Sequence, residues 1–226
     1  MYSKTKTWNS FVGCLHNCNY CKVSFQLQVK RWEKNNCLDC YYYRPHMHPE
    51  RLKRIPSAKI IFVCGDSDIR FAPLWYMEKI IKSIEEHNKK CPYKTYYFQS
   101  KDPKCFKPIL HLLPKNAIIL TTLETNKDEG YEKISKASKP SVRFKEFLEL
   151  DYPRKVVTIE PIMDFELEIF IDWIYQIKPE YVWIGFNSKP KKVQLPEPSL
   201  SKTEQFIDRL KKFTEVRGKE LRGLKI

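Results

Sequence analysis

The stretch Lys59-Ile-Ile-Phe-Val-Cys64, followed directly by Gly65-Asp-Ser-Asp68, indicates how the rest of the chain folds. Its apolar residues run without interruption and stop at a glycine and a group of polar side chains. A short apolar run bounded by turn residues is typical of a strand that is buried on both faces of a parallel sheet. Pro73 then opens a stretch without glycine or further proline, which favours a helix through about residue 89.

The same strand-then-helix pattern recurs along the 226-residue chain. Short apolar strands that alternate with helices predict an α/β fold with a parallel sheet covered by helices. About six such units are too few for a closed eight-fold barrel, so we expect a partial, open (β/α)6 barrel. A doubly wound sheet is the alternative, but it would use a G-x-G-x-x-G turn, which the sequence lacks. The other strands are predicted at 6–13, 95–99, 117–121, 155–159 and 181–185, and the other helices at 22–34, 104–112, 143–150, 165–177 and 200–217.

Polar side chains follow nearly every predicted strand. Active sites of β/α folds collect at the carboxyl ends of the strands, so these side chains are site candidates. The alternative is that strands simply end in polar loops. Glu124 and Glu160, however, lie at the edges of apolar runs, where an unpaired carboxylate is costly. The candidates are Asp66, Ser67, Asp68, Ser100, Lys101, Asp102, Thr122, Glu124, Glu160, Asn187 and Ser188.

Three cysteines lie close together in Cys14-Leu-His-Asn-Cys18-Asn-Tyr20-Cys21. Soft thiolates favour iron–sulfur clusters and zinc. A [4Fe–4S] cluster takes four ligands, so three cysteines without an obvious fourth leave one iron open, and an open metal position is where chemistry occurs. The alternatives are a zinc knuckle completed by Cys37 and Cys40, or three unrelated buried thiols.

A second group of metal-ligating residue types follows in the irregular segment 35–56. Cys37 and Cys40, with His46 and His48, form a candidate zinc site, although the H-x-H spacing is tighter than usual. An auxiliary cluster, a thiol donor and a pair of partly buried loop cysteines are the alternatives.

Composition and charge limit the classes of partner and the cellular compartment that we expect. The formal net charge of +14 favours a polyanionic partner such as DNA or RNA, unless the lysines merely reflect a lysine-rich proteome. The Tyr41-Tyr-Tyr-Arg44 run suits base stacking or loop packing. No run of about 18 apolar residues is present, so we expect no membrane span. The N-terminus has no apolar signal segment, and eight cysteines then favour a reducing cytoplasm.

The cysteine motif, with aromatic Tyr20 before its last cysteine, resembles that of the radical S-adenosylmethionine (radical SAM) superfamily. A combination of further motifs over about residues 7–188 resembles a phage- and prokaryote-associated radical-SAM-like family of largely undefined substrate. The Ser-Lys pair at 100–101 is also similar to a strand end of spore photoproduct lyase, a DNA-repair enzyme of the superfamily. The further motifs are Thr7-Trp8-Asn9, Arg44-Pro-x-x-His48-Pro-Glu-Arg-Leu52, Lys101-x-Pro103 and Ile159-Glu-Pro161.

The resemblance implies a partial (β/α)6 TIM-like barrel and a defined chemistry. Cys14, Cys18 and Cys21 would hold a [4Fe–4S] cluster whose open iron binds SAM, and a reductant such as ferredoxin or flavodoxin would supply one electron. SAM is then cleaved to methionine and a 5′-deoxyadenosyl radical, which abstracts hydrogen from the substrate. The implied SAM contacts are Tyr20 at the adenine, Gly65, Asp66, Ser67 and Asp68 at the ammonium, Lys101 at the carboxylate, Thr122 and Glu124 at the ribose and, more weakly, Asn187; Glu160 and Lys101 are the candidate catalytic residues.

The leading hypothesis is therefore a radical SAM enzyme, with nucleic acid as the favoured substrate and a peptide or small molecule as the runner-up. A hypothesis of another class is a zinc-stabilised nucleic-acid-binding module without catalysis. We expect a single domain over residues 1–226, with an insertion at 35–56 and a C-terminal loop and helix at 190–226.

Overall fold

The computed structural model describes residues 5–219 and 221–224. Its main feature is a seven-stranded sheet in the order β1-β4-β5-β6-β7-β8-β9, and every neighbouring pair in it is parallel. Each central strand is buried on both faces, as its apolar sequence predicts. The strands are β1 (Thr5–Trp8), β4 (Ile60–Val63), β5 (Thr95–Gln99), β6 (Ala117–Thr122), β7 (Lys155–Ile159), β8 (Tyr181–Gly185) and β9 (Glu215–Lys219).

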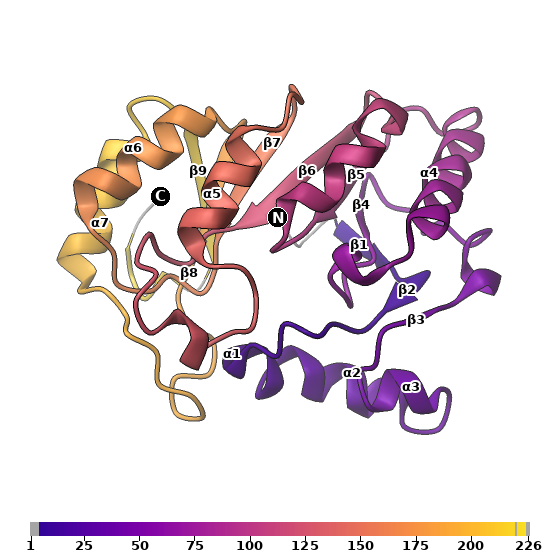
Figure 1. Ribbon diagram of the computed structural model, residues 1–226, viewed down its shortest axis with the longest axis horizontal. Coiled ribbons are helices and arrows are strands. Elements are labelled where there is room, and N and C mark those ends of the chain that lie inside the picture. Colours follow the sequence, from indigo (N-terminus) through magenta and orange to yellow (C-terminus); the bar gives the residue numbers. More distant parts are fainter. Residues whose placement is uncertain (1–4, 220, 225–226) are drawn as a thin grey trace.

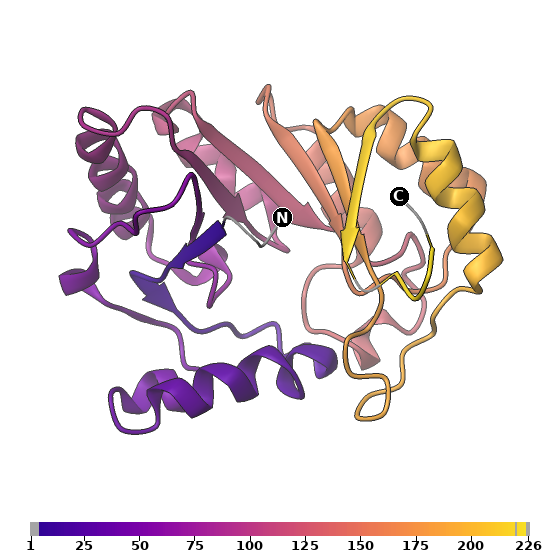
Figure 2. The same ribbon diagram turned by 180° about the vertical axis from the view of Figure 1, so that it is seen from behind.

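Helices cover one face of this sheet, and the sheet curls away from them (Figures 1 and 2). Within the described residues, β1 and β9 form the two edges of the sheet and do not pair with each other, so the sheet is a curled half-barrel. The predicted partial barrel of the α/β class is therefore confirmed. The covering elements are α4 (Leu74–Asn88), the 3-10 helix η4 (Pro103–Leu112), α5 (Pro140–Leu148), α6 (Leu167–Ile177) and α7 (Leu200–Leu210).

The two faces of the sheet carry different side chains. The face under the helices holds the large apolar core. The concave face holds a smaller cluster of Phe62, Tyr97, Ile118, Leu120, Val156, Tyr181 and Trp183. Residues two positions further along the same strands share that face, and there Gln99 donates to the hydroxyl of Thr122 over 2.7 Å and to that of Thr158 over 3.2 Å. The lining of the barrel therefore becomes polar toward the carboxyl ends of the strands.

A smaller layer lies across those carboxyl ends, toward which the strand arrowheads point in Figure 2. It consists of α1 (Asn19–Lys22), α2 (Phe25–Glu33), α3 (Leu38–Tyr41) and the antiparallel pair β2 (Phe11–Val12) and β3 (His46–Met47). Short 3-10 helices η2 (Pro49–Arg51), η3 (Ile69–Phe71) and η5 (Tyr131–Lys133) complete the fold. No helix within the described residues is long and apolar enough to span a membrane.

Two predicted elements at the N-terminal end are divided in the structure. The strand predicted at 6–13 is two strands, which are separated at Asn9. The Asn9 side chain donates to the Asp66 carboxylate and accepts from the Asp66 backbone NH. The helix predicted at 22–34 is preceded by α1 and begins at Phe25. Ser24 separates the two helices by donating its hydroxyl to the Tyr20 carbonyl over 2.6 Å.

The C-terminal prediction is wrong in its second half. The predicted helix at 200–217 ends at Leu210, and residues 215–219 form β9, the seventh parallel strand. Val216 is the one buried residue of β9, so the strand lacks the apolar run that identifies the others. It pairs with β8 along its whole length and stacks the Arg217 guanidinium on the Tyr181 ring.

Candidate functional site

The segment that carries Cys14, Cys18 and Cys21, here called the cysteine loop, is joined to the carboxyl end of β4. The backbone NH of Gly13 donates to the Asp66 carbonyl over 3.1 Å, and Gly13 forms a β-bridge with Ser67. Gly13 has a φ of +99°, and a Cβ there would lie 2.1 Å from the Arg44 carbonyl oxygen. Only glycine fits both conditions, so this residue lets the segment before Cys14 pass closely between β4 and the chain at Arg44.

The three thiols of the loop come together at the mouth of the half-barrel. Cys18 is buried, with its Sγ 3.0 Å from the Ser135 hydroxyl, whereas Cys14 and Cys21 are partly exposed. Burial raises the pKa of the Cys14 thiol well above its usual value and that of Cys21 to about 11, and the neighbouring Cys18 thiol adds to both shifts. A bound metal would offset this cost, because cations stabilise thiolates.

The chemistry of these three thiols suits an iron–sulfur cluster. Within the described residues, Cys14, Cys18 and Cys21 do not gather as tightly as a single-ion group does. A [4Fe–4S] cluster holds its cysteines on different iron atoms, so its thiolates lie farther apart than those around one zinc ion. The donor set, three soft thiols on one short loop, therefore fits a cluster ligated by three cysteines.

His16, in the middle of the loop, is bonded to Asp68. The two side chains are buried, with His16 Nε2 2.9 Å from Asp68 Oδ2. Asp68 also accepts from the Ser100 hydroxyl and from the backbone NH groups of Arg70 and Lys101. Burial raises the pKa of Asp68, but these hydrogen bonds outweigh it and hold the pKa below its usual value. Both carboxylate oxygens are thus used to join the loop to β4 and β5.

Asp66 is also buried, and it is hydrogen-bonded to Asn9. Its Oδ2 accepts from the Asn9 side chain over 2.7 Å, and its backbone NH donates to the same side chain over 3.0 Å. Burial, with the charge of Glu33 added, raises the pKa of Asp66 to about 6, and Arg51 opposes the shift. Gly65 beside it packs against Thr7, and Ser67 donates its hydroxyl to the Cys64 carbonyl.

Lys101, Tyr20 and Glu124, predicted separately, lie in one buried cluster. Glu124 Oε1 accepts from the Lys101 ammonium and, over 2.5 Å, from the Tyr20 hydroxyl. Lys101 also donates to the Tyr20 hydroxyl. Glu124 is fully buried, whereas the Lys101 side chain is 15% exposed. Glu124 therefore positions Lys101 and Tyr20 relative to each other at the mouth.

Two further members of this cluster were missed in the sequence. Arg143 of α5 is completely buried and donates to Glu124 Oε2 over 2.8 Å, while the Tyr131 hydroxyl donates to Oε1 over 3.1 Å. A signal for Arg143 exists, because helical spacing places it on the apolar face with Phe144 and Phe147. An arginine on such a face needs a buried partner.

Thr122 and Glu160 lie on the concave face of the sheet. The Thr122 hydroxyl accepts from Gln99 and from Thr158, and its carbonyl accepts from Arg143 of the Glu124 cluster. Glu160 Oε2 accepts from the Trp183 indole NH over 2.7 Å. A Cβ on Gly185 would lie 3.0 Å from the Glu160 carboxylate, so glycine there leaves room for it.

A cavity of about 180 Å³ opens between the cysteine loop and the ends of β7 and β8. Asn187 lies on its wall, but its side chain also ties its own loop by donating to the Val193 carbonyl and accepting from the Lys189 NH. The cavity is lined by Tyr20, Cys21, Ser24, Phe25, Glu160, Pro161, Phe186, Asn187 and Ser188. It brings Cys21 and Tyr20 of the loop to the same space as Glu160.

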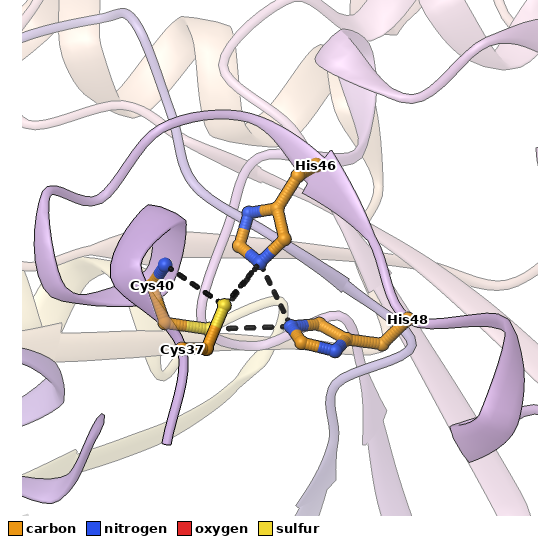
Figure 3. Close-up of side chains that lie close together, drawn as sticks. All are labelled: Cys37, Cys40, His46 and His48. Atoms are coloured by element: carbon orange, nitrogen blue, oxygen red, sulfur yellow. Dashed lines mark hydrogen bonds between the residues drawn. The ribbon is translucent and has the colours of Figure 1, made fainter. Parts of the chain in front are cut away.

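A second group of ligand-type side chains lies in the predicted insertion. The ligand atoms of Cys37, Cys40, His46 and His48 all lie within 4.8 Å of one another (Figure 3). Cys40 and His48 are buried, and the other two are partly exposed. The residues nominated by the C-x-x-C and H-x-H spacing are therefore brought together.

The three tyrosines before Arg44 have different surroundings. Tyr42 is 54% exposed, with the Arg44 guanidinium 4.8 Å from its ring centroid. Tyr41 lies under the Lys30 ammonium. Burial raises the pKa of Tyr43 well above its usual value, and the nearby Cys21 and Cys14 thiols add to the shift, so Tyr43 lies toward the cysteine loop. Of the three, Tyr42 is the one open to a stacking partner.

No protein-family model and no curated protein matches the chain. Solved structures do match it. SuiB of Streptococcus suis, in a complex with the precursor peptide SuiA, superposes on 96% of the chain with a TM-score of 0.59 and 10% identity. Spore photoproduct lyase also matches: a cysteine variant with dinucleoside spore photoproduct covers 92% with a TM-score of 0.51 and 12% identity, and a tyrosine variant covers 94% with 0.55 and 11%.

The chain has the fold of radical SAM enzymes. At 10–12% identity the likeness extends to the fold alone. The match covers 48% of SuiB and 61% and 75% of the two spore photoproduct lyase structures, so the chain spans about half the length of SuiB. Within this radical SAM fold, the cysteine loop lies at the carboxyl ends of the strands, where β/α folds place their active sites.

Proposed function

We propose that the protein is a radical SAM enzyme that cleaves SAM reductively with a [4Fe–4S] cluster. The observation that carries the proposal is the convergence of three thiols at the polar mouth of a half-barrel of this fold. When bound, the cluster would deliver one electron to SAM, whose cleavage yields a 5′-deoxyadenosyl radical that abstracts hydrogen. A one-electron reductant such as ferredoxin or flavodoxin would supply that electron, in the cytoplasm.

In this proposal, the residues around the mouth bind and orient the cofactors. Cys14, Cys18 and Cys21 hold the cluster, and Asp68 fixes their loop through His16. Asp66 offers its carboxylate to the SAM ammonium, with Gly65 and Ser67 shaping that strand end. Lys101 and Tyr20, held by Glu124, face the carboxylate and the adenine.

The other strand ends would complete this pocket. Asn187 and Glu160 line the cavity beside Cys21, while Thr122 supports the ribose end from below. Glu160 is the proposed catalytic residue together with Lys101.

Anaerobic reconstitution with iron and sulfide tests the function against a zinc-stabilised binding module. The enzyme should become brown and form 5′-deoxyadenosine from SAM and dithionite. A colourless protein that carries zinc and leaves SAM intact would favour the module instead.

Replacing Asp66 by Asn should weaken SAM binding by about ten- to a hundredfold, because a charge-assisted hydrogen bond contributes about 1.5–3 kcal/mol. Iron content should not change. The dissociation constant is best measured by anaerobic equilibrium dialysis at pH 8, where Asp66, with a pKa of about 6, is ionised. Asp172→Asn, on the outer helix α6, is the matched control. Equal dissociation constants in both variants would show that the end of β4 is not part of the SAM site.

For the substrate we propose nucleic acid, supported by the charge of +14 and by the exposed Tyr42–Arg44 stack. Binding of single-stranded DNA or RNA should weaken steeply with salt, because lysine and arginine contacts release counterions. Tyr42→Ala should lose about 1–3 kcal/mol for a stacked base. Tyr93→Ala, 70% exposed elsewhere, is the control. Absence of binding at low salt would make a peptide or a small molecule the favoured substrate class.

We also propose that the chain belongs to the phage- and prokaryote-associated radical-SAM-like family. Several family motifs have structural roles that fit together. The Trp8 indole donates to the Arg51 carbonyl over 2.8 Å, Asn9 clamps Asp66, and His48 donates its NH to the Ser10 carbonyl. The Thr-Trp-Asn and His-Pro-Glu-Arg motifs thus contact each other beside the cysteine loop.

A further inference from the structure

We propose that Cys37, Cys40, His46 and His48 bind a zinc ion that fixes the cysteine loop to the neighbouring layer. The site is separate from the proposed cluster and does not depend on the proposed reaction. Its four donors come from one short segment: Cys37 caps the start of α3, Cys40 lies within α3, and the histidines lie on and directly after β3.

The sulfur–nitrogen distances between donor atoms are close to those around one tetrahedral ion. Cys37 Sγ lies 3.3 Å from His46 Nε2, and Cys40 Sγ lies 3.4 Å from His46 Nε2 and 3.2 Å from His48 Nε2. Zinc–sulfur and zinc–nitrogen bonds of ordinary length place tetrahedral ligands about 3.5 Å apart. The four donors therefore surround a single point, as Figure 3 shows.

The hydrogen bonds of the two imidazoles orient their lone pairs toward that point. His46 Nδ1 lies 2.7 Å from the Arg44 carbonyl oxygen, and His48 Nδ1 lies 2.9 Å from the Glu50 carboxylate. Both partners only accept hydrogen bonds, so each Nδ1 carries the proton and each Nε2 presents a lone pair. Carbonyl and carboxylate partners of this kind also orient histidine ligands in zinc sites.

The two imidazole lone pairs face each other across a short gap. The Nε2 atoms of His46 and His48 are 2.8 Å apart, with two sulfur atoms beside them. Two neutral nitrogen acceptors at this distance repel each other unless a cation lies between them. A zinc ion supplies that cation, and the nitrogen atoms then separate by about half an ångström to reach tetrahedral spacing.

The donor set favours zinc in a structural role. Two thiolates and two neutral imidazoles balance the charge of a divalent ion and match the Cys2His2 type. Four protein ligands close the coordination shell, which leaves no position for substrate. The Cys40 NH also donates to Cys37 Sγ over 3.4 Å, which holds the two cysteines side by side.

The site is joined directly to the segment that enters the cysteine loop. His46 pairs with Val12 and Met47 with Phe11 in the β2–β3 ladder, and the His48 NH donates to the Ser10 carbonyl. Gly13, next to Cys14, lies against the Arg44 carbonyl, whose oxygen holds His46. Zinc at this site would therefore hold residues 10–13 in place, immediately before the first cluster cysteine.

The test measures metal in the full chain purified without iron under reducing conditions. Wild-type protein should hold one zinc per chain, and Co²⁺ exchanged into it should give strong visible bands of a tetrahedral site with a thiolate charge-transfer band. The Cys37→Ser/Cys40→Ser variant should lose both signals. Cys91→Ser, which alters a partly exposed cysteine elsewhere, should keep them.

Two more measurements keep the result interpretable if the double serine variant folds poorly. The Cys14→Ala/Cys18→Ala/Cys21→Ala variant should retain the zinc and the cobalt spectrum. In wild-type protein, zinc removal by a chelator should speed amide hydrogen exchange over residues 10–14 and 44–48. The proposal is overturned if wild-type protein binds neither zinc nor cobalt, if the zinc leaves with the first three cysteines, or if chelation leaves exchange unchanged.

Discussion

Replacing Cys18 by Ala is expected to abolish 5′-deoxyadenosine formation by the anaerobically reconstituted protein and to lower its iron content. Cys18 is the central of the three proposed cluster ligands and the most buried, at 5% exposure. With three protein ligands and one open iron, the cluster has no spare cysteine to replace a lost one. Buried Ser135 beside it would leave only a hydroxyl, which is a poor ligand for iron–sulfur clusters.

Cys91→Ala is the matched control for this experiment. Cys91 follows the end of α4, where its NH donates to the His87 carbonyl, and it has no place in the proposed site. Iron, the visible cluster absorption and 5′-deoxyadenosine should all remain at wild-type values in this variant. Full SAM cleavage by Cys18→Ala, measured by chromatography of the quenched reaction, would show that the cluster assignment is wrong.

The sequence predicts the central strands of this fold well, because strands that are buried on both faces consist of uninterrupted apolar residues. The bounds expected for the strands at 95–99, 155–159 and 181–185 are those observed. The seventh strand, Glu215–Lys219, was missed because it lies at the edge and buries one side chain. An edge strand forms by pairing with its one neighbour, here Tyr181–Gly185. The amino-acid composition of the edge strand does not predict that pairing.

For the candidate site, spacing predicts which residues meet when they are close in sequence. Cys37, Cys40, His46 and His48 do meet, because a few residues of chain allow few arrangements. Contacts between distant segments were not predictable in the same way. The pairing of His16 with Asp68 and that of Glu124 with Arg143 depend on how β4, β6 and α5 are placed in space.

The buried cluster around Glu124 should make this residue one of the most important for stability. Its carboxylate lies between Arg143 and Lys101, and the exposed fractions of the Glu124 and Arg143 side chains are both 0%. Glu124→Gln removes the charge that both cations share and changes the volume little. Removing one partner of a buried ion pair costs about 3–5 kcal/mol, so we expect a loss of that size in the free energy of unfolding, measured with urea.

The remaining contacts of Arg143 make this loss hard to avoid by rearrangement. Its Nε and Nη2 have no hydrogen-bond partner among the described residues. The guanidinium lies 4.8 Å from the Tyr131 ring centroid, a favourable but weaker contact. Without Glu124 the charge would therefore be held mainly by an aromatic face and a backbone carbonyl.

The pH dependence of unfolding gives a second measure of the same cluster. Burial raises the pKa of Glu124, but Arg143 and Lys101 outweigh it and hold the pKa well below its usual value. A carboxyl whose pKa is lower in the folded state adds stability above its unfolded pKa of about 4.3, and that stability is lost as the pH falls. Below about pH 5 the wild type should therefore lose stability faster than Glu124→Gln.

A surface variant and a double variant complete the test. Glu168→Gln removes a carboxylate that pairs with Arg209 on the exposed faces of α6 and α7, and its unfolding should match that of the wild type. Glu124→Leu/Arg143→Met removes both buried charges, so it should be less destabilised than the sum of its single variants. If Glu124→Gln unfolds like Glu168→Gln, the buried cluster does not hold Lys101 and Tyr20 in place as proposed.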